Sequence, residues 1–494
     1  MKNSSEAFYS ALVSRDPRFD GVFYVAVTST GIYCRPVCTA RTPRAANCRF
    51  FESREMAEKS GFRPCLRCRP ELAPGNAPVD DASRIAGLIA QRIGEGMLDD
   101  GAGLERIAAQ FGWSSRQIRR ILRRQLGVSP IELALTRRLL LAKQLLTETR
   151  LPIAEVALAS GFSSLRRFND AFSKRYRMPP TRFRTGAADS PSPAAGGTFT
   201  LQLGYRAPFD WAGLLSFVGA RALDGVEAVA GLVYLRTVEL GRHRGWIRVS
   251  NLEERRMLQV ELTHSLTPAL PALLGRLRNL FDLSARPDVI AAHLASDPVL
   301  ARSVSAHPGL RVPGAFNGFE LALRAILGQQ VSVKAATTLA GRFAEAFGRP
   351  IETPYAELRR LSPLPEIVAE AEPSQIASLG ITGGRAASII ALAREISSGR
   401  LRLDPGIDHD GAADQLVSLP GIGPWTASYV AMRALRSPDA FPAADMVIRR
   451  NLGGVTAAHA EEMSQAWSPW RSYATLHLWR EHSIRTDPGR KRPG

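Results

Sequence analysis

The stretch "LPGIGPWTASYVAMRALRSPDAFPAAD" at residues 419–445 contains a turn of small, helix-breaking residues between two apolar segments. In residues 410–419 the apolar side chains recur roughly along one face, which is typical of an amphipathic helix. Pro424 suits the first turn of a following helix, because its missing N–H would have no intrahelical partner there. The stretch therefore predicts a helix, a tight hairpin at 420–423 and a second helix.

The hairpin residues predict a backbone site for phosphate. Gly421 and Gly423 carry no Cβ, so backbone amides can approach a phosphate closely. The N-terminus of the second helix adds partial positive charge. With the intervening Ile422, these residues predict a sequence-neutral clamp on the DNA backbone, a device that also serves proteins that only hold DNA.

Asp445 returns a carboxylate 22 positions after Gly423, directly before the segment "MVIRRN". One interpretation is an N-cap, whose side-chain oxygen accepts a hydrogen bond from the helix that follows. The other interpretation is a catalytic carboxylate. The two roles are compatible because the helix dipole keeps such a carboxylate ionised, and both stay open at this point.

Charge and length bound the class of protein. A chain of 494 residues predicts three or four domains, and its net charge of +18 favours nucleic acid over an anionic membrane as partner. No apolar run approaches the roughly 18 residues of a membrane span, and the first 16 residues lack a signal-type apolar core. We expect a cytoplasmic, reducing location without disulfides and without a membrane partner.

Composition divides the chain at two Pro- and Gly-punctuated segments. Residues 198–265 alternate like strands around a helix at 211–222, which predicts a small mixed α/β subdomain, and the pattern beyond 286 is helical. The expected fold class is multidomain and mainly α. The expected boundaries are 1–75, 80–184, a linker at 185–197, 198–285, 286–485 and a disordered, basic tail at 486–494.

The cysteines form two close pairs, Cys34 with Cys38 and Cys65 with Cys68, separated by 26 residues. This spacing predicts a tetrahedral site for one zinc ion held by four thiolates. The site is either a purely structural staple or a reactive centre. We do not expect Cys48 to be a ligand.

Residues 104–126 and 153–176 repeat one design, a helix, a Gly-containing turn and a basic helix, with Gly112 and Gly161 49 positions apart. The pattern predicts two helix-turn-helix units, with a generic basic helical bundle as the alternative. The expected DNA contacts are Arg116, Arg119, Arg120, Arg166 and Arg167.

Two of these regions resemble known families. "TGIYCRPVCTARTPRAANCRFF" (30–51) and "GFRPCLRCRP" (61–70) resemble the N-terminal domain of the Ada DNA-repair proteins, which implies that Cys34 takes a methyl group irreversibly from a DNA methylphosphotriester. Four thiolates around Zn²⁺ carry a charge of −2 and stay nucleophilic, and methylation leaves −1, which should raise DNA affinity. The repeated helical units resemble the AraC-type domain and imply promoter DNA and RNA polymerase as partners.

Residues 198–485 resemble the AlkA-type 3-methyladenine glycosylases of the helix-hairpin-helix superfamily, through "RAILGQQVS" (324–332), "LPGIGPWTA" (419–427) and "WSPWRSYATLHLW" (467–479). The resemblance implies that Asp445 is the catalytic carboxylate. Some relatives carry a second acid directly before it, whereas this chain has Ala444, so Asp445 is the only candidate in this segment. It implies that Trp425, Tyr429 and Trp479 form the walls of the base pocket. It also places Gln330 at the gap left by the flipped nucleotide, where some relatives carry an apolar residue.

The chemistry follows from the groups present. Aromatic stacking and cation–π attraction offset the cost of extruding a cationic alkylated purine, which leaves without a general acid. Lyase-active relatives carry a lysine where this chain has Trp425, and the clustered cysteines of iron–sulfur relatives are missing. We therefore expect a monofunctional, monomeric glycosylase without an iron–sulfur cluster or organic cofactor, and His477 packed beside the pocket.

The leading prediction is thus an alkylation-response protein that accepts methyl groups, activates transcription and excises alkylated bases. The alternative is a transcription regulator with a structural zinc site and a glycosylase-like half that only binds DNA. Because no cysteine follows residue 68, the family's O6-methylguanine methyltransferase activity should be missing.

Overall fold

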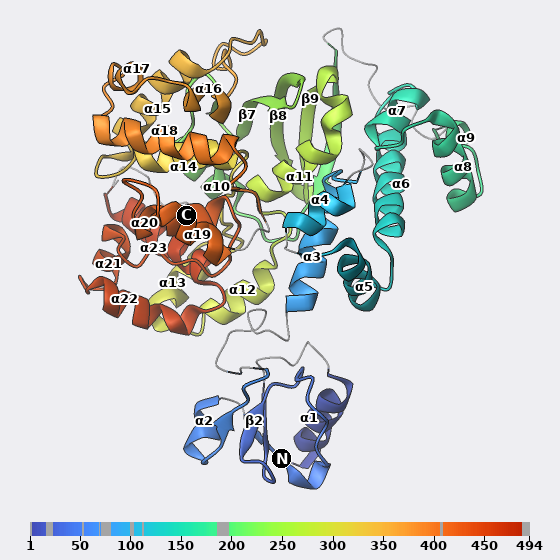
Figure 1. Ribbon diagram of the computed structural model, residues 1–494, viewed down its shortest axis with the longest axis vertical. Helices are drawn as coiled ribbons and strands as arrows, with labels where there is room; N and C mark the ends of the chain where they lie inside the picture. Colours follow the sequence, from blue (N-terminus) through green and yellow to red (C-terminus); the bar gives the residue numbers. More distant parts are fainter. Residues whose placement is uncertain are drawn as a thin grey trace. The chain divides into compact units, whose positions relative to one another are not determined.

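The computed structural model describes residues 2–15, 23–51, 54–68, 70, 81–98, 103–110, 113–184, 197–405 and 409–486 (Figure 1). Most of the expected linker at 185–197 and of the tail at 486–494 lies outside these residues. The described chain is mainly helical, as predicted, and none of its helices is long and apolar enough to cross a membrane. It forms two compact units, residues 1–91 with 113–130 and residues 92–112 with 131–494.

A small four-stranded sheet organises the cysteine region in the order β3-β1-β2-β4. β2 and β4 run parallel, with Tyr33 opposite Pro64, and the Cys65 N–H donates to the Tyr33 carbonyl at 3.0 Å. Cys34 and Cys65 therefore leave the same end of two neighbouring strands. The elements are α1 (Lys2–Ser14), β1 (Tyr24–Val27), β2 (Ile32–Cys34), β3 (Cys48–Phe51), α2 (Arg54–Lys59) and β4 (Arg63–Pro64).

Seven helices follow among the described residues, and matching serine caps begin the two basic ones. The Ser114 side chain accepts from the Gln117 N–H at the start of α5, and Ser164 accepts from the Arg167 N–H at the start of α8. The predicted repeat is therefore visible in its caps, although Gly112 lies outside the described residues. The helices are α3 (Asp81–Gly94), α4 (Gly103–Gln110), α5 (Ser115–Leu126), α6 (Pro130–Glu148), α7 (Ile153–Ala159), α8 (Leu165–Tyr176) and α9 (Pro180–Phe183).

The mixed subdomain contains an antiparallel sheet in the order β5-β9-β8-β7-β6, in which β7, β8 and β9 lie side by side (Figure 1). The predicted strands and the helix near 211–222 are confirmed, whereas the short β6 was not predicted. The elements are β5 (Thr198–Gly204), α10 (Trp211–Gly219), β6 (Glu227–Ala230), β7 (Val233–Leu240), β8 (His243–Leu252), β9 (Met257–Thr263) and α11 (Leu270–Leu280).

Helix α6 is bonded to the edge of this sheet. Gln144 Nε2 donates to the Gln202 carbonyl at 2.7 Å, and the Gln202 N–H donates to Glu148 Oε2 at 2.8 Å. Burial raises the pKa of Glu148, although the hydrogen bonds from Gln144 and Gln202 oppose this shift. Apolar side chains of α6, α7 and α8 also share one core with the sheet, so the second basic helix is attached to the subdomain by packing.

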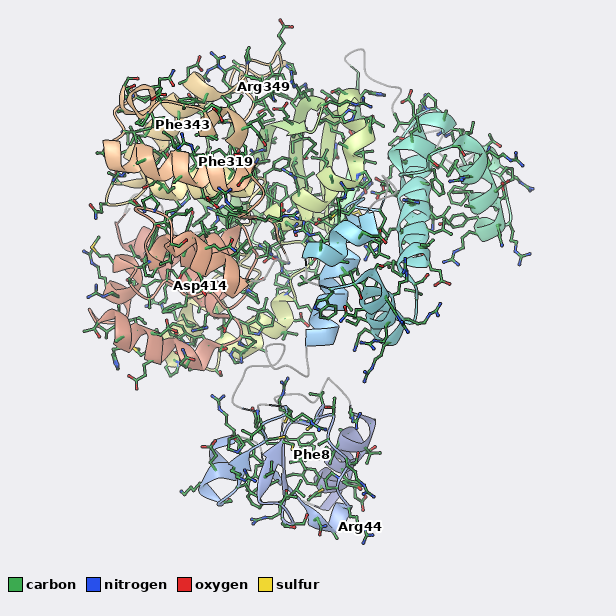
Figure 2. The ribbon with its side chains drawn as sticks, in the orientation of Figure 1. Phe8, Arg44, Phe319, Phe343, Arg349 and Asp414 are labelled. Atoms are coloured by element: carbon green, nitrogen blue, oxygen red, sulfur yellow. The ribbon has the colours of Figure 1, made fainter. Side chains whose placement is uncertain are left out.

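The remainder of the chain is helical, as predicted. Phe319 of α14 and Phe343 of α15 are buried in its core (Figure 2). The helices are α12 (Pro287–Leu294), α13 (Pro298–Ala306), α14 (Gly318–Leu327), α15 (Val333–Phe347), α16 (Pro365–Ala369), α17 (Pro373–Ala377), α18 (Gly383–Ser397), α19 (His409–Val417), α20 (Pro424–Arg433), α21 (Met446–Asn451), α22 (Ala457–Ser464) and α23 (Arg471–Thr486).

Candidate functional site

The predicted hairpin joins α19 to α20. Gly421 has φ +73°, and a Cβ there would lie 2.3 Å from Ser388 Oγ, so both backbone conformation and space require glycine. Gly423 has open space around it. The N–H groups of these two glycines donate to no acceptor in the described part of the chain. Ile422 differs, because its side chain is buried in the core and its N–H donates to the Leu419 carbonyl.

A neighbouring loop between α14 and α15 is bonded to this hairpin. Gln329 Nε2 donates to the Gly421 carbonyl at 2.9 Å and to Thr426 Oγ1 at 3.0 Å. The next residue, Gln330, is exposed and left-handed at φ +55°, a strained conformation for a non-glycine residue. Gln330, the predicted gap-filling residue, is thus exposed on a loop that the hydrogen bonds of Gln329 attach to the hairpin. Sequence reasoning did not single out Gln329.

The Asp445 carboxylate accepts four hydrogen bonds from neutral donors. Its Oδ1 accepts from the Val447 and Ile448 N–H groups at 2.9 and 3.0 Å, as the N-cap of α21. Trp479 Nε1 donates to the same oxygen at 3.1 Å, and Trp425 Nε1 donates to Oδ2 at 2.9 Å. No cation pairs with Asp445 in the ranges that the structure describes. The cap and the aromatic contact therefore coexist.

The two tryptophan donors belong to a group of four neighbouring rings. We call Trp425, Tyr429, Trp479 and Phe217 the aromatic cluster. The Trp425 and Tyr429 rings stack with centroids 5.4 Å apart and planes at 9°. Tyr429 and Trp479 are 6.1 Å apart, and Trp479 lies nearly parallel to Phe217 at 6.2 Å. The structure therefore brings together the three predicted wall residues and adds Phe217 from α10, which sequence reasoning did not single out.

The four paired cysteines meet as predicted. Their sulfur atoms all lie within 4.8 Å of one another, and zinc–sulfur bonds of about 2.3 Å give a tetrahedron with edges of roughly 3.8 Å. Hydrogen bonding with Cys38 and Cys68, together with burial, raises the pKa of the Cys34 thiol, so the group favours a cation that would let every sulfur ionise. The residues thus fit Zn²⁺.

Cys34 is partly exposed, whereas the other three cysteines of this group are buried. The Arg35 N–H donates to the sulfur of Cys68 at 3.4 Å, a typical second contact for a thiolate. Cys48 stays outside the group and donates its thiol hydrogen to the Arg44 carbonyl. The partly exposed residue of the group is therefore the one that sequence reasoning selected.

Both basic helices present their predicted arginines outward. Arg119 and Arg120 are exposed on α5, whose opposite side buries Ile118. Arg166 and Arg167 are likewise exposed on α8, opposite buried phenylalanines. Arg116 is exposed as well. This arrangement suits contact with a polyanion.

His477 is buried and bonded to α13. It is 4% exposed, and its Nδ1 is 3.0 Å from Ser303 Oγ. Burial and the nearby charges lower its pKa to about 3, so the imidazole is neutral at neutral pH. The expectation that it is packed in the interior agrees with this burial.

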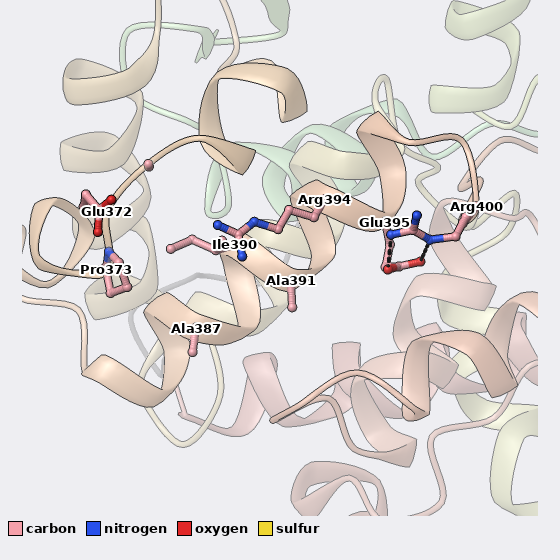
Figure 3. A pocket seen from close by; sticks show the side chains of 9 residues that line it. Glu372, Pro373, Ala387, Ile390, Ala391, Arg394, Glu395 and Arg400 are labelled. Carbon is pink, nitrogen blue, oxygen red and sulfur yellow. Dashed lines mark hydrogen bonds and ion pairs between the residues drawn. The ribbon is translucent and has the colours of Figure 1, made fainter.

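One cavity of about 370 Å³ lies along α17 and α18 (Figure 3). Its polar wall includes Glu372, Arg394 and the ion pair of Glu395 with Arg400. It shares no residue with the aromatic cluster, and we assign it no role in the chemistry.

The class of protein follows from family models that match most of the chain. They are the metal binding domain of Ada (residues 7–71), a helix-turn-helix domain (107–186), the AlkA N-terminal domain (200–317) and the HhH-GPD superfamily base excision DNA repair proteins (323–471). The domain types predicted from the sequence are confirmed.

Individual relatives narrow this class. The chain is 39% identical to the "Probable bifunctional transcriptional activator/DNA repair enzyme AlkA" of Mycobacterium tuberculosis, over 99% of both chains. It therefore belongs to the family of bifunctional transcriptional activator/DNA repair enzymes. It is also 36% identical to "DNA-3-methyladenine glycosylase 2" of Escherichia coli, over 56% of this chain and 95% of that one.

The fold of the C-terminal half has solved counterparts. The 3-methyladenine DNA glycosylase of Archaeoglobus fulgidus matches with a TM-score of 0.50 and 21% identity, over 58% of this chain and 99% of that chain. At this level of identity the likeness concerns the fold.

Proposed function

We propose that the C-terminal half hydrolyses the N-glycosidic bond of alkylated purines of the 3-methyladenine type, with Asp445 as the catalytic carboxylate. The single observation that carries this proposal is the Asp445 carboxylate itself, held by two tryptophan N–H groups and two backbone N–H groups at the edge of the aromatic cluster. A DNA-holding protein has no need of an unpaired carboxylate fixed beside stacked rings.

The mechanism uses this carboxylate as a fixed negative charge. An N3- or N7-alkylated purine is already cationic, so the C–N bond breaks with the electron pair leaving on the base. Positive charge then develops on the sugar, where the preoriented carboxylate stabilises it. Water adds to the anomeric carbon and loses its proton. The N–H groups of Gly421 and Gly423, which have no acceptor in the described part of the chain, would hold the phosphate. The exposed Gln330 would fill the gap that the extruded nucleotide leaves.

The proposed activity is monofunctional. A lyase needs a lysine amine to form a Schiff base with the opened sugar. At the corresponding position, Trp425 instead donates its indole N–H to Asp445. Water is therefore the nucleophile, and the product is an intact abasic site.

The test is release of free methylated base from methylated DNA by the wild type and by Asp445→Asn. Asparagine keeps the cap and the shape but removes the charge, so we expect base release to fall by at least about 10²-fold while DNA binding persists. Retained turnover would remove Asp445 from this role. Strand cleavage without added base would contradict the monofunctional assignment.

For the N-terminal region we propose stoichiometric methyl transfer to Cys34. The Cys34 thiolate attacks the methyl carbon of a methylphosphotriester; an S–C bond forms, the C–O bond breaks, and a phosphodiester anion leaves. One Zn²⁺ held by Cys34, Cys38, Cys65 and Cys68 would keep the sulfur ionised. The partial exposure of Cys34 among buried partners supports its choice as acceptor.

Mass spectrometry after exposure to methylated DNA tests this step. We expect one added methyl group per chain, located on Cys34, and none in Cys34→Ser. An unmodified Cys34 in zinc-loaded protein would leave the metal site purely structural.

We propose further that this methylation activates transcription through the AraC-like helices, with promoter DNA and RNA polymerase as partners of a monomer. The proposed domains are 1–75, 80–184, 198–285 and 286–485, without an iron–sulfur cluster or organic cofactor and with a cytoplasmic location. The outward arginines of α5 and α8 support the DNA contact. Methylation-dependent transcription from a target promoter in vitro tests this proposal. We expect Arg166→Gln and Arg167→Gln to lose this transcription.

A further inference from the structure

A second pocket, of about 180 Å³, is lined by the end of α3, by α6 and by α11, helices that are labelled in Figure 1. All of its lining residues belong to one of the two compact units. Helix α6 lies in the match to the helix-turn-helix domain, and α11 lies in the match to the AlkA N-terminal domain. The pocket is therefore at the junction of these two domains, and it shares no residue with the aromatic cluster.

The charged residues that line this pocket are all positive. Among the residues that the structure describes, they are Arg137 and Arg138 of α6 and Arg278 of α11, without an aspartate or glutamate. A Cβ on Gly94 would lie 3.7 Å from Arg137 Nη1, which places this guanidinium beside the end of α3. Most of the remaining lining is apolar, as at Leu274, and such walls focus the field of the arginines into the pocket.

Two of these arginines lack an anionic partner. In the described part of the chain the side chains of Arg137 and Arg278 take part in no ion pair and no hydrogen bond. Arg138 differs, because its Nη2 donates to the Leu98 carbonyl at 3.1 Å. Desolvation by the surrounding protein lowers the pKa of Arg278, and the positive charge of Arg137 lowers it further. Like charges at one pocket repel each other, so an anion bound there would relieve an unfavourable interaction.

The acidic residue next to this lining, Glu95, is engaged by other groups. Its Oε2 accepts a hydrogen bond from Arg92 Nη1 at 3.2 Å, and its Oε1 accepts one from Asn279 Nδ2 at 3.4 Å. A Cβ on Gly275 would lie 2.5 Å from Glu95 Cγ, so this side chain lies against α11. Glu95 is not part of the pocket lining, and its carboxylate is already bonded.

The uncharged polar side chains of the lining are also bonded within the protein. The Ser160 hydroxyl donates to the Val156 carbonyl at 2.7 Å. Gln144 Nε2 donates to the Gln202 carbonyl at 2.7 Å, across the same junction of domains. The guanidinium N–H groups are therefore the main donors that the pocket offers to a ligand.

We propose that Arg137, Arg138 and Arg278 bind a single phosphate group at this junction. Guanidinium groups bind phosphate oxygens in bidentate fashion, and the several oxygens of one phosphate can meet three arginines where the two of a carboxylate cannot. A volume of about 180 Å³ is below the roughly 300–1,000 Å³ of pockets that enclose whole small molecules, so it suits one phosphate group rather than a nucleotide.

A phosphate bound here would connect the helix-turn-helix region with the mixed subdomain. Arg137 and Arg278 are exposed, so the pocket can be reached from solvent by a free phosphate ion or by a phosphate of a DNA backbone. The site uses neither Asp445 nor Cys34, and the inference stands apart from base release and methyl transfer.

The first measurement is the melting temperature of the zinc-loaded full chain in sodium phosphate and in sodium chloride at equal ionic strength. A ligand that binds the folded chain raises the melting temperature, so we expect a phosphate-dependent rise in the wild type. The rise should shrink in Arg137→Gln and Arg278→Gln and largely return in Arg278→Lys, which keeps the charge. Arg286→Gln is the matched control, because Arg286 is an exposed arginine outside the pocket that pairs with exposed Asp288.

The second measurement identifies the source of the phosphate. Binding of an undamaged DNA duplex is followed by fluorescence anisotropy across a salt series. If the DNA backbone supplies the phosphate, Arg278→Gln should lower the affinity about tenfold. The slope of log affinity against log salt should also be smaller in magnitude by about 1 than in Arg286→Gln. If a free ion is the ligand, this slope is equal in the two variants and only the phosphate-dependent melting rise differs. Equal melting behaviour together with equal DNA binding in Arg278→Gln and Arg286→Gln would overturn the proposal.

Discussion

Cys34 contributes one of four sulfurs crowded within 4.8 Å, whereas at Asp445 a single carboxylate receives hydrogen bonds only from neutral N–H groups. Crowded thiolates need a cation to ionise together, so the first site depends on a metal. The aspartate is held by a helix terminus and two indoles, which are present as soon as the chain folds. Under the proposed functions the first site would be consumed by its reaction and the second regenerated, and the two ways of holding charge suit those outcomes.

Metal removal should separate the two sites completely. A strong chelator is expected to abolish methyl transfer to Cys34 and to unfold the small cysteine region, because the four thiolates lose their shared cation. Base release should persist, since its donors are neutral N–H groups. Mass spectrometry for the methyl group and base release on the same sample measure both. Parallel loss of the two activities would contradict the independence of the sites.

Removing one indole donor at a time tests the neutral donors of Asp445. Trp425→Phe and Trp479→Phe keep an aromatic ring, although a smaller one, but lose a hydrogen bond to a charged group, worth roughly 1.5–3 kcal/mol. We expect base release to fall about 10- to 100-fold in each, with the melting temperature little changed. Trp246→Phe, distant in sequence and uninvolved with Asp445, is the control. Unchanged rates would show that the cap alone positions the carboxylate.

The hairpin glycines offer a matched pair. Gly421→Ala adds a Cβ 2.3 Å from buried Ser388 and places it at φ +73°, so we expect a destabilisation of roughly 1–3 kcal/mol by chemical denaturation. Gly423→Ala meets open space, so stability should stay within about 0.5 kcal/mol. DNA affinity measured by anisotropy should nevertheless fall, because the methyl group intrudes on the phosphate. Unaltered affinity in Gly423→Ala would argue against the clamp.

The smallest effect concerns the charge change at Cys34. Methylation converts a group of charge −2 into one of −1, so DNA affinity should rise several-fold at low salt and less as salt is added. Binding of methylated and unmethylated protein to one promoter at matched salt measures this difference. Equal dissociation constants across the salt series would mean that activation does not work through charge.

The sequence by itself determined much of the architecture. The cysteine spacing, the two basic helices and the Gly-x-Gly hairpin are local patterns whose structure depends on a few neighbouring residues, and all appear where they were expected. β6 was missed because four residues, "EAVA", carry too little periodicity to distinguish a strand. Its place is set by pairing with β7.

Only the tertiary structure decided how the site is assembled. Phe217, Arg221 and Gln329 lie far in sequence from Asp445. Phe217 and Arg221 lie in none of the quoted motifs, and the stretch 324–332 that contains Gln329 does not show that its side chain bonds to the hairpin. They reach the aromatic cluster or the hairpin because α14 and α20 share one apolar core, against which Phe217 of α10 also packs. Residue types specified the reactive groups, whereas packing specified the neighbours that aim the carboxylate and brought the arginines of α6 and α11 to one pocket.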